Sequence, residues 1–477
     1  MRELDVRNPR TGAADANIKV YSQEEVLQLS NAQRQAQRQW RDKGVVYRCE
    51  QLQRWKAQLL SASNDIAGAL CADTGRRAFA HFELFKVIEF IDHWVQRAPV
   101  LMAEEGRGVS AMMPSVHYTH RLVPYQLVGV ISPWNVPLVL ALIDSIPALL
   151  AGSSVLLKPS EVTPRFAGPL KKSVRGIAGL EDVFQVVTGD AETGKAVVDH
   201  VDAICFTGSV ATGRKVALHA AQRFIPAFLE LGGKDPAIVL PSADLDRATT
   251  AIVRSAIGMT GQACQSLERV LVHESVFDAF LAKVVEEVEH LDLNWPDIGK
   301  GQVGPLIFAP QAQVLSAQLD DARAQGAVIH CGGQVESHGG GAWCQPTVIS
   351  EVTSDMLLLR EETFGPLIPL MPFATTEEAI ASANTSEFGL SAAVFAGGTD
   401  EAIAVAEQLE VGAVSINDAS LTGLANDVEK NSFRYSGMGG SRMGDSGLRR
   451  FLRKRALLIQ TEEPASMAIF DECQINA

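Results

Sequence analysis

Short apolar runs alternate with helix-like stretches between residues 127 and 231, and this alternation is the strongest constraint on the fold. The runs lie at residues 127–132, 155–158, 183–187 and 203–206. Strands joined by helices favour a parallel sheet, because the helix is the crossover that returns the chain to the same edge of the sheet. We therefore predict an α/β fold built on a parallel sheet in this region.

A second unit of the same kind is expected after Gly233. The chain has 477 residues, which is too many for one compact core. Apolar runs at residues 236–240, 346–349 and 368–371 have the character of buried strands. They predict a second α/β unit that follows the first along the chain.

The N-terminal part of the chain has helical character. Apolar side chains recur at helical spacing in residues 22–42, 46–74 and 79–95, and Ser22 is a candidate N-cap with acidic residues after it. The third helix is expected to end before Pro99. We expect these helices to cover one face of the first sheet.

Two further strands belong to neither sheet. Residues 116–122 mostly alternate between apolar and polar side chains, and residues 456–460 form a run near the C-terminus. Exposed apolar edge strands invite pairing with another chain. The sequence thus predicts a homodimer or a homotetramer.

The charge balance excludes several classes of partner. A net charge of −14 provides no polybasic surface for nucleic acid or for an anionic membrane. The one basic run, at residues 449–455, fits a solvated helix face. The apolar stretch at residues 136–143 is far shorter than the roughly 20 residues of a membrane span, and residues 1–5 do not resemble a signal peptide. We expect a soluble, cytoplasmic protein.

The seven cysteines are odd in number and scattered, from Cys49 to Cys473. They form no CxxC word and no Cys/His pair at zinc spacing, so no metal site is predicted. Free thiols of this kind are typical of a reducing compartment.

Two reactive side chains stand out between residues 228 and 270. Glu230 lies in an apolar run before the pair Gly232-Gly233, and a carboxylate in apolar surroundings has a raised pKa and can act as a base. Cys264 lies among small residues at a turn, where a thiolate is open to a substrate. Taken alone, such a cysteine is more often a small buried apolar residue, and such a glutamate a surface or capping residue.

Four short sequence motifs favour the functional interpretation of Cys264 and Glu230 over the structural one. They are Glu230-Leu-Gly-Gly-Lys, Gly261-Gln-Ala-Cys264, Pro133-Trp-Asn135-Val-Pro137 and Glu362-Thr-Phe364-Gly-Pro. Together they resemble the aldehyde dehydrogenase superfamily, and the resemblance extends from Asn8 to about Gln460.

The resemblance implies a Rossmann-like parallel-sheet cofactor domain, a second α/β catalytic domain and a small β oligomerisation element. The cofactor domain would comprise residues 1–112 and 126–231, and the catalytic domain residues 232–445. The oligomerisation element would comprise residues 113–125 and 446–477.

The resemblance also implies the roles of the reactive residues. Cys264 would be the nucleophile and Glu230 the general base, while the Asn135 side-chain amide and the Cys264 backbone N–H would stabilise the oxyanion. The implied reaction oxidises an aldehyde to the carboxylic acid through a cysteine thiohemiacetal and a thioester. Glu362 and Glu268 are the next carboxylates to test as the base.

The implied cofactor is NAD. Lys158 and Glu161 match residues that bind the adenosine ribose in the family, and a carboxylate there would repel the 2′-phosphate of NADP. Gly208 and Gly213 have the spacing of a phosphate-binding P-loop, but Arg214 occupies the lysine position, and no Gly-x-Gly-x-x-Gly word follows a strand. The expected cofactor residues are Ser132, Trp134, Lys158, Ser160, Glu161, Gly189, Gly208, Ser209, Leu231, Gly232, Glu362 and Phe364.

The expected substrate residues carry no positive charge. We therefore expect an apolar aldehyde, aromatic or longer aliphatic, to bind better than a carboxylate-bearing semialdehyde. Residues 418–431 can add polar groups to this pocket. The expected pocket residues are Val136, Leu140, Ile143, Met259 and Gln265.

The chain departs from the commonest family pattern at three places. Asp144 stands where many members carry a basic residue, residues 257–259 replace a frequent aromatic-x-Asn word, and residues 432–442 replace the usual Pro-Phe-Gly-Gly run. Three alternatives stay open: a semialdehyde dehydrogenase, a CoA-acylating dehydrogenase, and a non-catalytic binding protein on the same fold. Glu230 argues against the CoA-acylating enzyme, because that chemistry needs no base for water.

Overall fold

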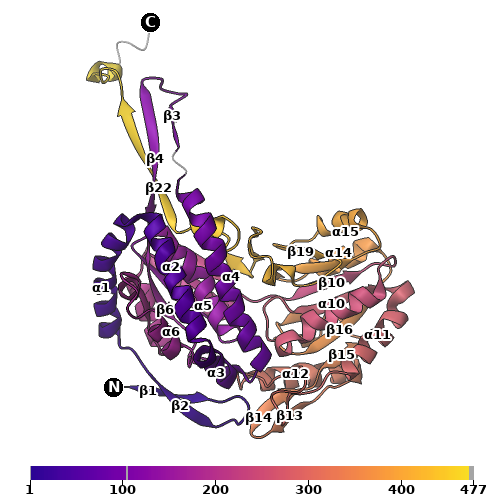
Figure 1. Cartoon of the computed structure of the whole chain (residues 1–477). Coiled ribbons are helices and arrows are strands. Elements are labelled where there is room, and N and C mark those ends of the chain that lie inside the picture. Colours follow the sequence, from indigo (N-terminus) through magenta and orange to yellow (C-terminus); the bar gives the residue numbers. More distant parts are fainter. Residues whose placement is uncertain (1, 104–105, 472–477) are drawn as a thin grey trace.

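A computed structural model of the protein describes residues 2–103 and 106–471. The chain forms two α/β bodies and an arm of three strands that projects from the first body (Figure 1). The predicted α/β class is confirmed. In the part of the chain that the structure describes, no helix has the length and apolar character needed to cross a membrane. Cys473 lies outside the described residues, and the other cysteines are free thiols.

The first sheet contains the strands predicted between residues 127 and 231. Its six strands lie in the order β21-β9-β8-β5-β6-β7, and all are parallel except β21, which pairs antiparallel with β9. The strands are β5 (Leu127–Ile131), β6 (Ser154–Lys158), β7 (Phe184–Val186), β8 (Ala203–Thr207), β9 (Ala227–Glu230) and β21 (Gly437–Met438).

Helices cover both faces of this sheet. Val155 and Leu157 of β6 face α5 (Pro137–Ala151), and further N-terminal helices pack behind α5 in the same apolar cluster. Leu156 points to the opposite face, which α8 (Ala191–His200) and α9 (Val210–Gln222) cover. Successive side chains of a strand point to opposite faces, so a fully buried strand requires this double cover.

The N-terminal helices differ from the prediction in two places. α1 (Gln23–Asp42) begins after Ser22 with the expected capping box. Residues 46–74 belong to two helices, α2 (Gly44–Ser61) and α3 (Ser63–Thr74), rather than one. α4 (Arg77–Met102) continues through Pro99, because Leu101 is buried against the core and this packing outweighs the hydrogen bond that proline removes.

The second sheet contains the strands predicted after Gly233. Its seven strands lie in the order β12-β15-β16-β11-β10-β18-β19, and all are parallel except β12. The predicted runs are β10 (Asp235–Val239), β15 (Thr347–Ser350) and β16 (Leu367–Phe373), joined by β11 (Leu267–His273), β12 (Val328–Cys331), β18 (Ala392–Phe395) and β19 (Val414–Ile416). One face packs against α10 (Leu245–Ile257) and α11 (Phe277–Glu289), the other against α14 (Thr376–Ala383) and α15 (Thr399–Ala406).

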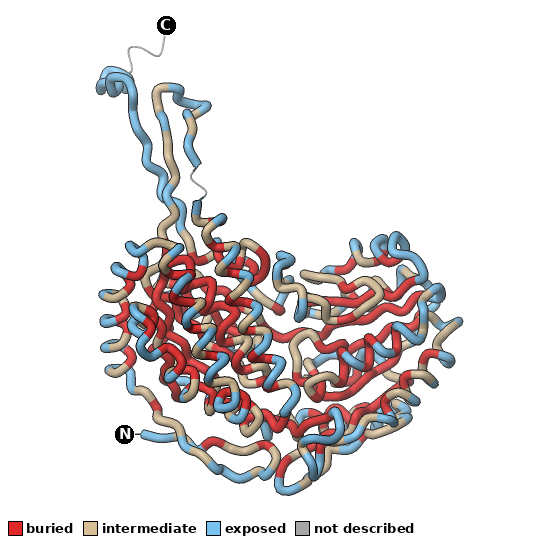
Figure 2. The backbone as a smooth tube through the Cα atoms, viewed as in Figure 1, coloured by how far each residue is buried: buried red, intermediate tan, exposed pale blue. Residues whose placement is uncertain are grey.

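An antiparallel arm extends from the first body. It consists of β3 (Arg107–Val109), β4 (Val116–Pro124) and β22 (Leu452–Gln460). β22 pairs with β4 along its whole length and is mostly exposed (Figure 2). The basic run at residues 449–455 therefore begins at the end of α16 (Ser446–Arg449) and continues on β22. The helix face expected there was wrong, because pairing with β4 draws the segment into a strand.

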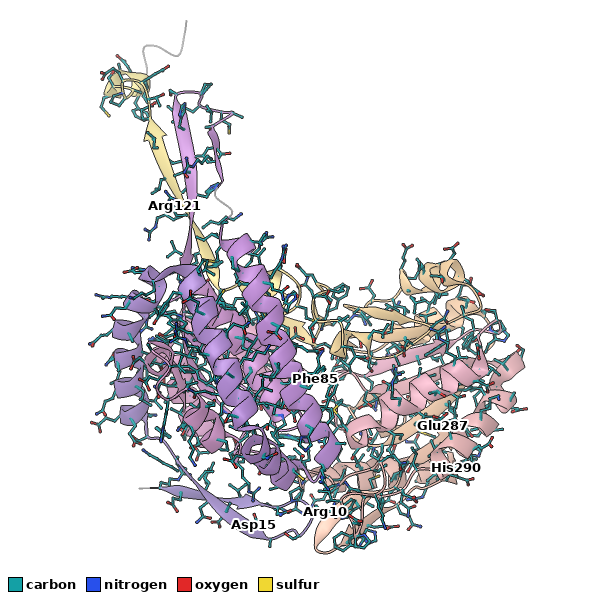
Figure 3. The ribbon with its side chains drawn as sticks, viewed as in Figure 1. Arg10, Asp15, Phe85, Arg121, Glu287 and His290 are labelled. Atoms are coloured by element: carbon teal, nitrogen blue, oxygen red, sulfur yellow. The ribbon has the colours of Figure 1, made fainter. Side chains whose placement is uncertain are left out.

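Arg10 joins the two bodies near the N-terminus (Figure 3). Its guanidinium donates to the Asn294 side chain at 2.8 Å and lies over the Trp343 ring, 5.3 Å from the centroid. The smaller elements are β1 (Glu3–Arg7), β2 (Ala14–Lys19), α6 (Ala167–Ser173), α7 (Leu180–Val183), α12 (Gln311–Ala324), β13 (Val335–His338), β14 (Gly341–Cys344), α13 (Leu357–Arg360), β17 (Phe388–Gly389) and β20 (Phe433–Arg434).

Glu83 of α4 fixes the start of α5. Its Oε2 accepts hydrogen bonds from the backbone N–H groups of Leu138 and Val139, at 2.8 and 3.1 Å. Burial raises the pKa of Glu83 from 4.5 to about 7, against the lowering effect of these N–H groups and of Arg76. A raised folded-state pKa contributes stability that is complete below pH 4.5 and is lost as the pH rises through about 7.

The wild type should lose thermal stability between about pH 5 and about pH 8 as Glu83 ionises. We expect Glu83→Gln to lose less, because glutamine cannot ionise. Ionisation of this carboxyl lowers the free energy of unfolding by up to ~3 kcal/mol. The measurement is the apparent Tm of both proteins across this range at fixed salt and protein concentration. Glu89→Gln, on the exposed face of the same helix, is the matched control and should follow the wild type. Parallel curves for Glu83→Gln and wild type would contradict the assignment.

Candidate active site

A cavity of about 800 Å³ lies at the carboxyl ends of the first sheet. Its walls come from the segments that follow β5, β6, β8 and β9, together with residues of the second body. The carboxyl edge of a parallel sheet is the usual ligand-binding edge of α/β proteins. The cavity therefore lies where the fold favours a ligand.

All but one of the predicted cofactor residues line this cavity. Those on its wall are Ser132, Trp134, Lys158, Ser160, Glu161, Gly208, Ser209, Leu231, Gly232, Glu362 and Phe364. Gly189 is not among the lining residues: it is buried against α8, where an added Cβ would lie 2.1 Å from Thr193 Oγ1. The prediction missed the basic side chains of Lys195, Lys215 and His219 on the wall. Of these, Lys215 had a sequence signal, because it follows the glycines with P-loop spacing.

The cavity has surfaces that fit a dinucleotide. Lys158 Nζ pairs with Glu161 Oε2 at 2.7 Å, which provides a polar site for a ribose. Ser209 caps the N-terminus of α9, whose free N–H groups favour a phosphate. Trp134 and Phe364 form an edge-to-face pair, with ring centroids 5.3 Å apart, that offers an apolar surface to a ring.

Cys264 lies on a tight loop between α10 and β11 and lines the same cavity. Residues 259–261 take left-handed backbone conformations, with φ between 56° and 66°. An added Cβ at Gly261 would lie 2.2 Å from the Gly365 carbonyl oxygen, so the turn requires glycine. The loop is thus held against the segment that carries Glu362.

Asn135 follows β5 and is tied to the cysteine loop. Its Nδ2 donates to the Gln262 carbonyl at 2.9 Å, and the Gln262 side chain is itself fully buried. A primary amide has two N–H groups. The second N–H of Asn135 has no bond among the described residues and can donate to a ligand in the cavity that Asn135 and Cys264 line together.

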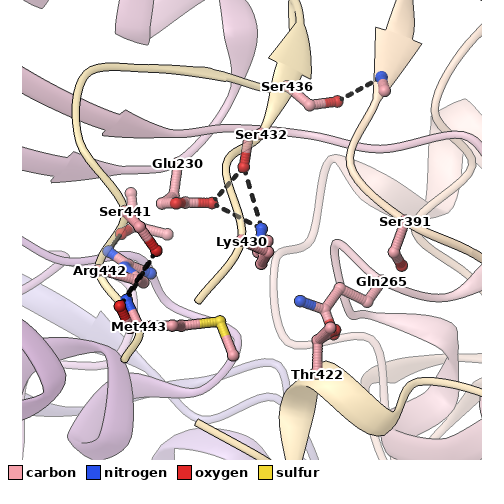
Figure 4. Close-up of polar contacts among 12 residues, drawn as sticks. Glu230, Gln265, Ser391, Thr422, Lys430, Ser432, Ser436, Ser441, Arg442 and Met443 are labelled. Carbon is pink, nitrogen blue, oxygen red and sulfur yellow. Dashed lines mark hydrogen bonds and ion pairs between the residues drawn. The ribbon is translucent and has the colours of Figure 1, made fainter. Parts of the chain in front are cut away.

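Glu230 ends β9, and its carboxylate lies in polar surroundings (Figure 4). Oε2 accepts a hydrogen bond from Ser432 Oγ at 2.7 Å and pairs with Lys430 Nζ at 3.4 Å. Lys430 also donates to Ser432 Oγ at 3.0 Å. The apolar surroundings expected from the sequence were wrong, because pairing of β21 with β9 brings the polar segment before β21 alongside Glu230.

The Cys264 thiol is strongly perturbed. Burial raises its pKa to about 12; the Lys430 ammonium lowers it, and the carboxylates of Glu362, Asp235 and Glu230 raise it further. These surroundings disfavour the thiolate. A base has to take its proton before the sulfur can act as a nucleophile.

Two further carboxylates, Glu362 and Glu268, position the part of the cavity wall formed by the segment that follows α13. Glu362 Oε1 accepts the Gly233 backbone N–H at 3.1 Å, and burial raises the pKa of Glu362 to about 8. Glu268 accepts the backbone N–H groups of residues 363–364, at 2.7 and 2.8 Å, and pairs with buried Lys234 at 2.7 Å. These bonds commit Glu268 to holding the loop, which argues against it as an alternative base.

Asp144 lies on α5, at the position where many members of the family carry a basic residue. Its charge is neutralised by arginines of the C-terminal segment. Its carboxylate accepts a hydrogen bond from Arg442 Nη2 at 2.8 Å and also pairs with Arg450. Arg442 donates to the Thr207 hydroxyl as well, and its charge interacts with those of Glu230 and Cys264. Sequence reasoning did not single out Lys430, Ser432 or Arg442. The signal available for Ser432 and Arg442 was the departure of residues 432–442 from the family pattern, and for Lys430 it was the polar contribution expected from residues 418–431.

The predicted substrate residues are only partly in this cavity. Leu140 lines it, whereas Val136, Ile143, Met259 and Gln265 are not among its lining residues. Ile143 is buried in the core of the first body. The Gln265 side chain accepts the Thr422 hydroxyl at 2.7 Å, so it faces the loop after β19.

Comparison with known proteins gives one consistent family. A sequence profile described as the aldehyde dehydrogenase family matches residues 1–457. A protein of Mycolicibacterium smegmatis, provisionally named a succinate-semialdehyde dehydrogenase for NADP(+), is 34% identical over 470 residues, which cover 96% of this chain and 90% of that protein. The 4,4′-diapolycopene aldehyde oxidase of Methylomonas sp is 36% identical over 398 residues, which cover 82% of this chain and 74% of that protein.

A solved structure shows the same architecture. It is that of a provisionally named aldehyde dehydrogenase, PutA, from Anabaena variabilis. It superposes with a TM-score of 0.95 at 49% sequence identity, and the match covers 98% of this chain and 99% of that chain.

Proposed function

The chain belongs to the aldehyde dehydrogenase family, and we propose that it oxidises an apolar aldehyde, aromatic or longer aliphatic, to the carboxylic acid with NAD. Family membership makes it an NAD(P)-dependent oxidoreductase; the substrate class, the choice of NAD and the residue roles are the proposal. The observation that supports it best is that Cys264, Asn135 and nearly all the predicted cofactor residues line one cavity.

We propose the following roles. The Cys264 sulfur attacks the aldehyde carbon, and the free N–H of Asn135 and the Cys264 backbone N–H stabilise the oxyanion. NAD, when bound, supplies the acceptor for the hydride that leaves the substrate carbon. The acyl group is then a thioester on Cys264, and Glu230 takes a proton from the water that hydrolyses it.

The preference for NAD is supported by Glu161. Its carboxylate lies at the site proposed for the adenosine ribose, where it would repel a 2′-phosphate. The positive charge of Lys158 is paired with Glu161 and is therefore not free for that phosphate. The Mycolicibacterium smegmatis relative is named for NADP(+), so the preference of this chain for NAD needs a direct test.

The apolar substrate is supported by Leu140 on the cavity wall and by the relative named for diapolycopene aldehyde. A semialdehyde is the second candidate, because the Mycolicibacterium relative carries that name. The two cations whose charges act on the Cys264 thiol are both engaged: Lys430 by Glu230 and Ser432, and Arg442 by Asp144 and Thr207. Neither is free to anchor a substrate carboxylate, which favours the apolar aldehyde. A CoA-acylating reaction is the third candidate and has no need of Glu230.

We also propose assembly through the arm and the domain division stated above. β22 presents the exposed apolar side chains Leu457, Leu458 and Ile459 at the free edge of the arm's sheet. A free apolar edge favours pairing with the same edge of a second copy. The boundaries proposed at residues 112, 126, 232 and 445 leave β21 in the second domain by sequence, although it pairs with β9 of the first sheet.

Steady-state kinetics should separate the three candidate reactions. We expect kcat/KM to be higher with NAD than with NADP by about tenfold or more, equivalent to 1.4 kcal/mol. Benzaldehyde and hexanal should be better substrates than succinate semialdehyde, and CoA should have no effect. Comparable values for the two cofactors would refute the NAD preference, and a marked preference for succinate semialdehyde would refute the apolar substrate.

Cys264→Ala and Glu230→Gln should block different steps of the reaction. Without the nucleophile, no NADH should form at all. Glu230→Gln keeps the nucleophile, so it should give a burst of up to about one NADH per site, then slow turnover because water lacks its base. Stopped-flow absorbance and the mass of an acyl adduct on Cys264 measure these steps. Wild-type turnover by Glu230→Gln at neutral pH would show that another group is the base.

Light scattering tests the proposed assembly. We expect the wild type to be a dimer or a tetramer, and Leu458→Asp to weaken assembly, because it places a charge in the proposed apolar interface. Leu218→Asp, at an exposed leucine of α9 in the first body, is the matched control and should not change the mass. A stable, active wild-type monomer would contradict the proposal.

A further inference from the structure

Phe308 is an aromatic side chain of the second body that lines the cavity but belongs to none of the four sequence motifs. We propose that Phe308 is a cofactor-binding residue that packs against the nicotinamide half of the dinucleotide, and that buried Gln262 is the positioning residue that holds it there. The inference deepens the proposed function and rests on it for one point, that the nicotinamide lies beside Cys264.

The Phe308 ring adds to an aromatic surface that spans the junction between the two bodies. Phe308 is 37% exposed, and its ring centroid lies 5.8 Å from that of Trp134, which follows β5 of the first body. Trp134 also makes the edge-to-face contact with Phe364 described above. The three rings lie on the wall of one cavity, and a large apolar side chain that is exposed there gains free energy when a ligand covers it.

Phe308 lies at the end of the cavity formed by the second body, which also carries Cys264. Gln311, on the first turn of α12, lines the same cavity, and its Nε2 donates to the Thr363 carbonyl at 2.6 Å. Thr363 lies between the predicted cofactor residues at positions 362 and 364. The polar pair proposed for the adenosine ribose, by contrast, belongs to the first body. Because the hydride acceptor has to reach a substrate carbon on Cys264, the nicotinamide half is the half that meets Phe308.

Gln262 fixes the segment that carries Phe308. The Gln262 side chain is fully buried; its Oε1 accepts the Ile307 backbone N–H at 2.9 Å, and its Nε2 donates to the Pro305 carbonyl at 3.1 Å. Ile307 immediately precedes Phe308, so these two bonds set where the aromatic side chain leaves the backbone. Gln262 is part of the loop that carries the proposed nucleophile, and the Phe308 segment is therefore attached directly to that loop.

The Gln262 backbone holds the other side of the same wall. Its carbonyl accepts a hydrogen bond from Asn135 Nδ2 at 2.9 Å, and Asn135 is the residue after Trp134, whose ring contacts Phe308. One buried residue is thus bonded to the proposed oxyanion amide through its backbone and to the Phe308 segment through its side chain. Because a shift of Gln262 would move both, this residue positions Phe308 and Asn135 relative to each other.

The test is the Kd for NAD, measured by isothermal titration calorimetry with no aldehyde present. We expect Phe308→Ala to raise this Kd by about three- to tenfold, because the nicotinamide half loses an aromatic contact. The Kd for AMP, which occupies only the adenosine end, should change by less than about twofold. Phe85→Ala removes an exposed phenylalanine of α4 and should match the wild type.

A double-variant comparison tests the positioning role of Gln262. Gln262→Met keeps the size of the side chain but leaves two buried backbone groups unpaired, so the Phe308 segment should shift and the Kd for NAD should rise. If Gln262 acts by holding Phe308, Gln262→Met combined with Phe308→Ala should bind NAD no more weakly than the weaker single variant. Gln313→Met, at an exposed glutamine of α12, is the matched control and should leave the Kd unchanged.

A second variant replaces Gln262→Met in this comparison if that protein does not fold. The Thr260 hydroxyl donates to the Gly304 carbonyl at 3.1 Å and accepts the Gly304 backbone N–H at 3.0 Å. Thr260→Ala removes both bonds and loosens the same segment at its start. Its effect on the Kd for NAD should likewise disappear in the Phe308→Ala background.

Three results would overturn the proposal. They are an unchanged Kd for NAD in Phe308→Ala, an equal loss for NAD and AMP, and losses that multiply in the double variant. NAD and NADP are both titrated, so an error in the proposed choice of NAD appears in the wild type, and the effect of Phe308→Ala is read with the dinucleotide that binds. Binding requires no turnover, so failure of the roles proposed for Cys264 and Glu230 would leave the binding result unaffected.

Discussion

The site depends on a close approach that only glycine permits. A Cβ on Gly233 would lie 2.3 Å from the Cys264 carbonyl oxygen, and a Cβ on Gly232 would lie 2.6 Å from the carboxylate oxygens of Glu362. At this pair the end of the first sheet meets the cysteine loop and the Glu362 loop of the second body. Without the pair, the nucleophile loop and the cofactor wall could not share one cavity.

The residue after the glycine pair keeps that junction rigid. Lys234 is fully buried and pairs with Glu268, whose carboxylate also holds the backbone N–H groups of Thr363 and Phe364. Removing one partner of such a pair leaves an uncompensated buried charge, which typically costs about 3–5 kcal/mol. The same ion pair therefore supports the core of the second body and orients the wall that faces the proposed cofactor.

The sequence predicted what local pattern determines. Apolar runs identified β5, β6, β7 and β8 of the first sheet, and the Ser22 cap identified the start of α1. The motifs selected Cys264, Asn135, Glu362 and Phe364, which line one cavity. The prediction failed where tertiary packing determines the structure. At Pro99, for example, burial of the following residues allows the helix to continue past the proline. The Lys430–Glu230 pair joins residues far apart in the chain, through a two-residue strand that no period could reveal.

The Asp144 cluster has a consequence for how such a chain can diverge. The carboxylate on α5 faces two buried guanidinium groups, Arg442 and Arg450, from a distant segment. A single exchange of Asp144 for a basic residue would bury three cations together. Loss of the two arginines would instead leave the buried Asp144 carboxylate without a counter-ion. Descent between this arrangement and one with a basic residue on α5 therefore requires substitutions both at position 144 and in the segment that carries Arg442 and Arg450, and an ancestor with only one of these changes would carry unbalanced buried charge.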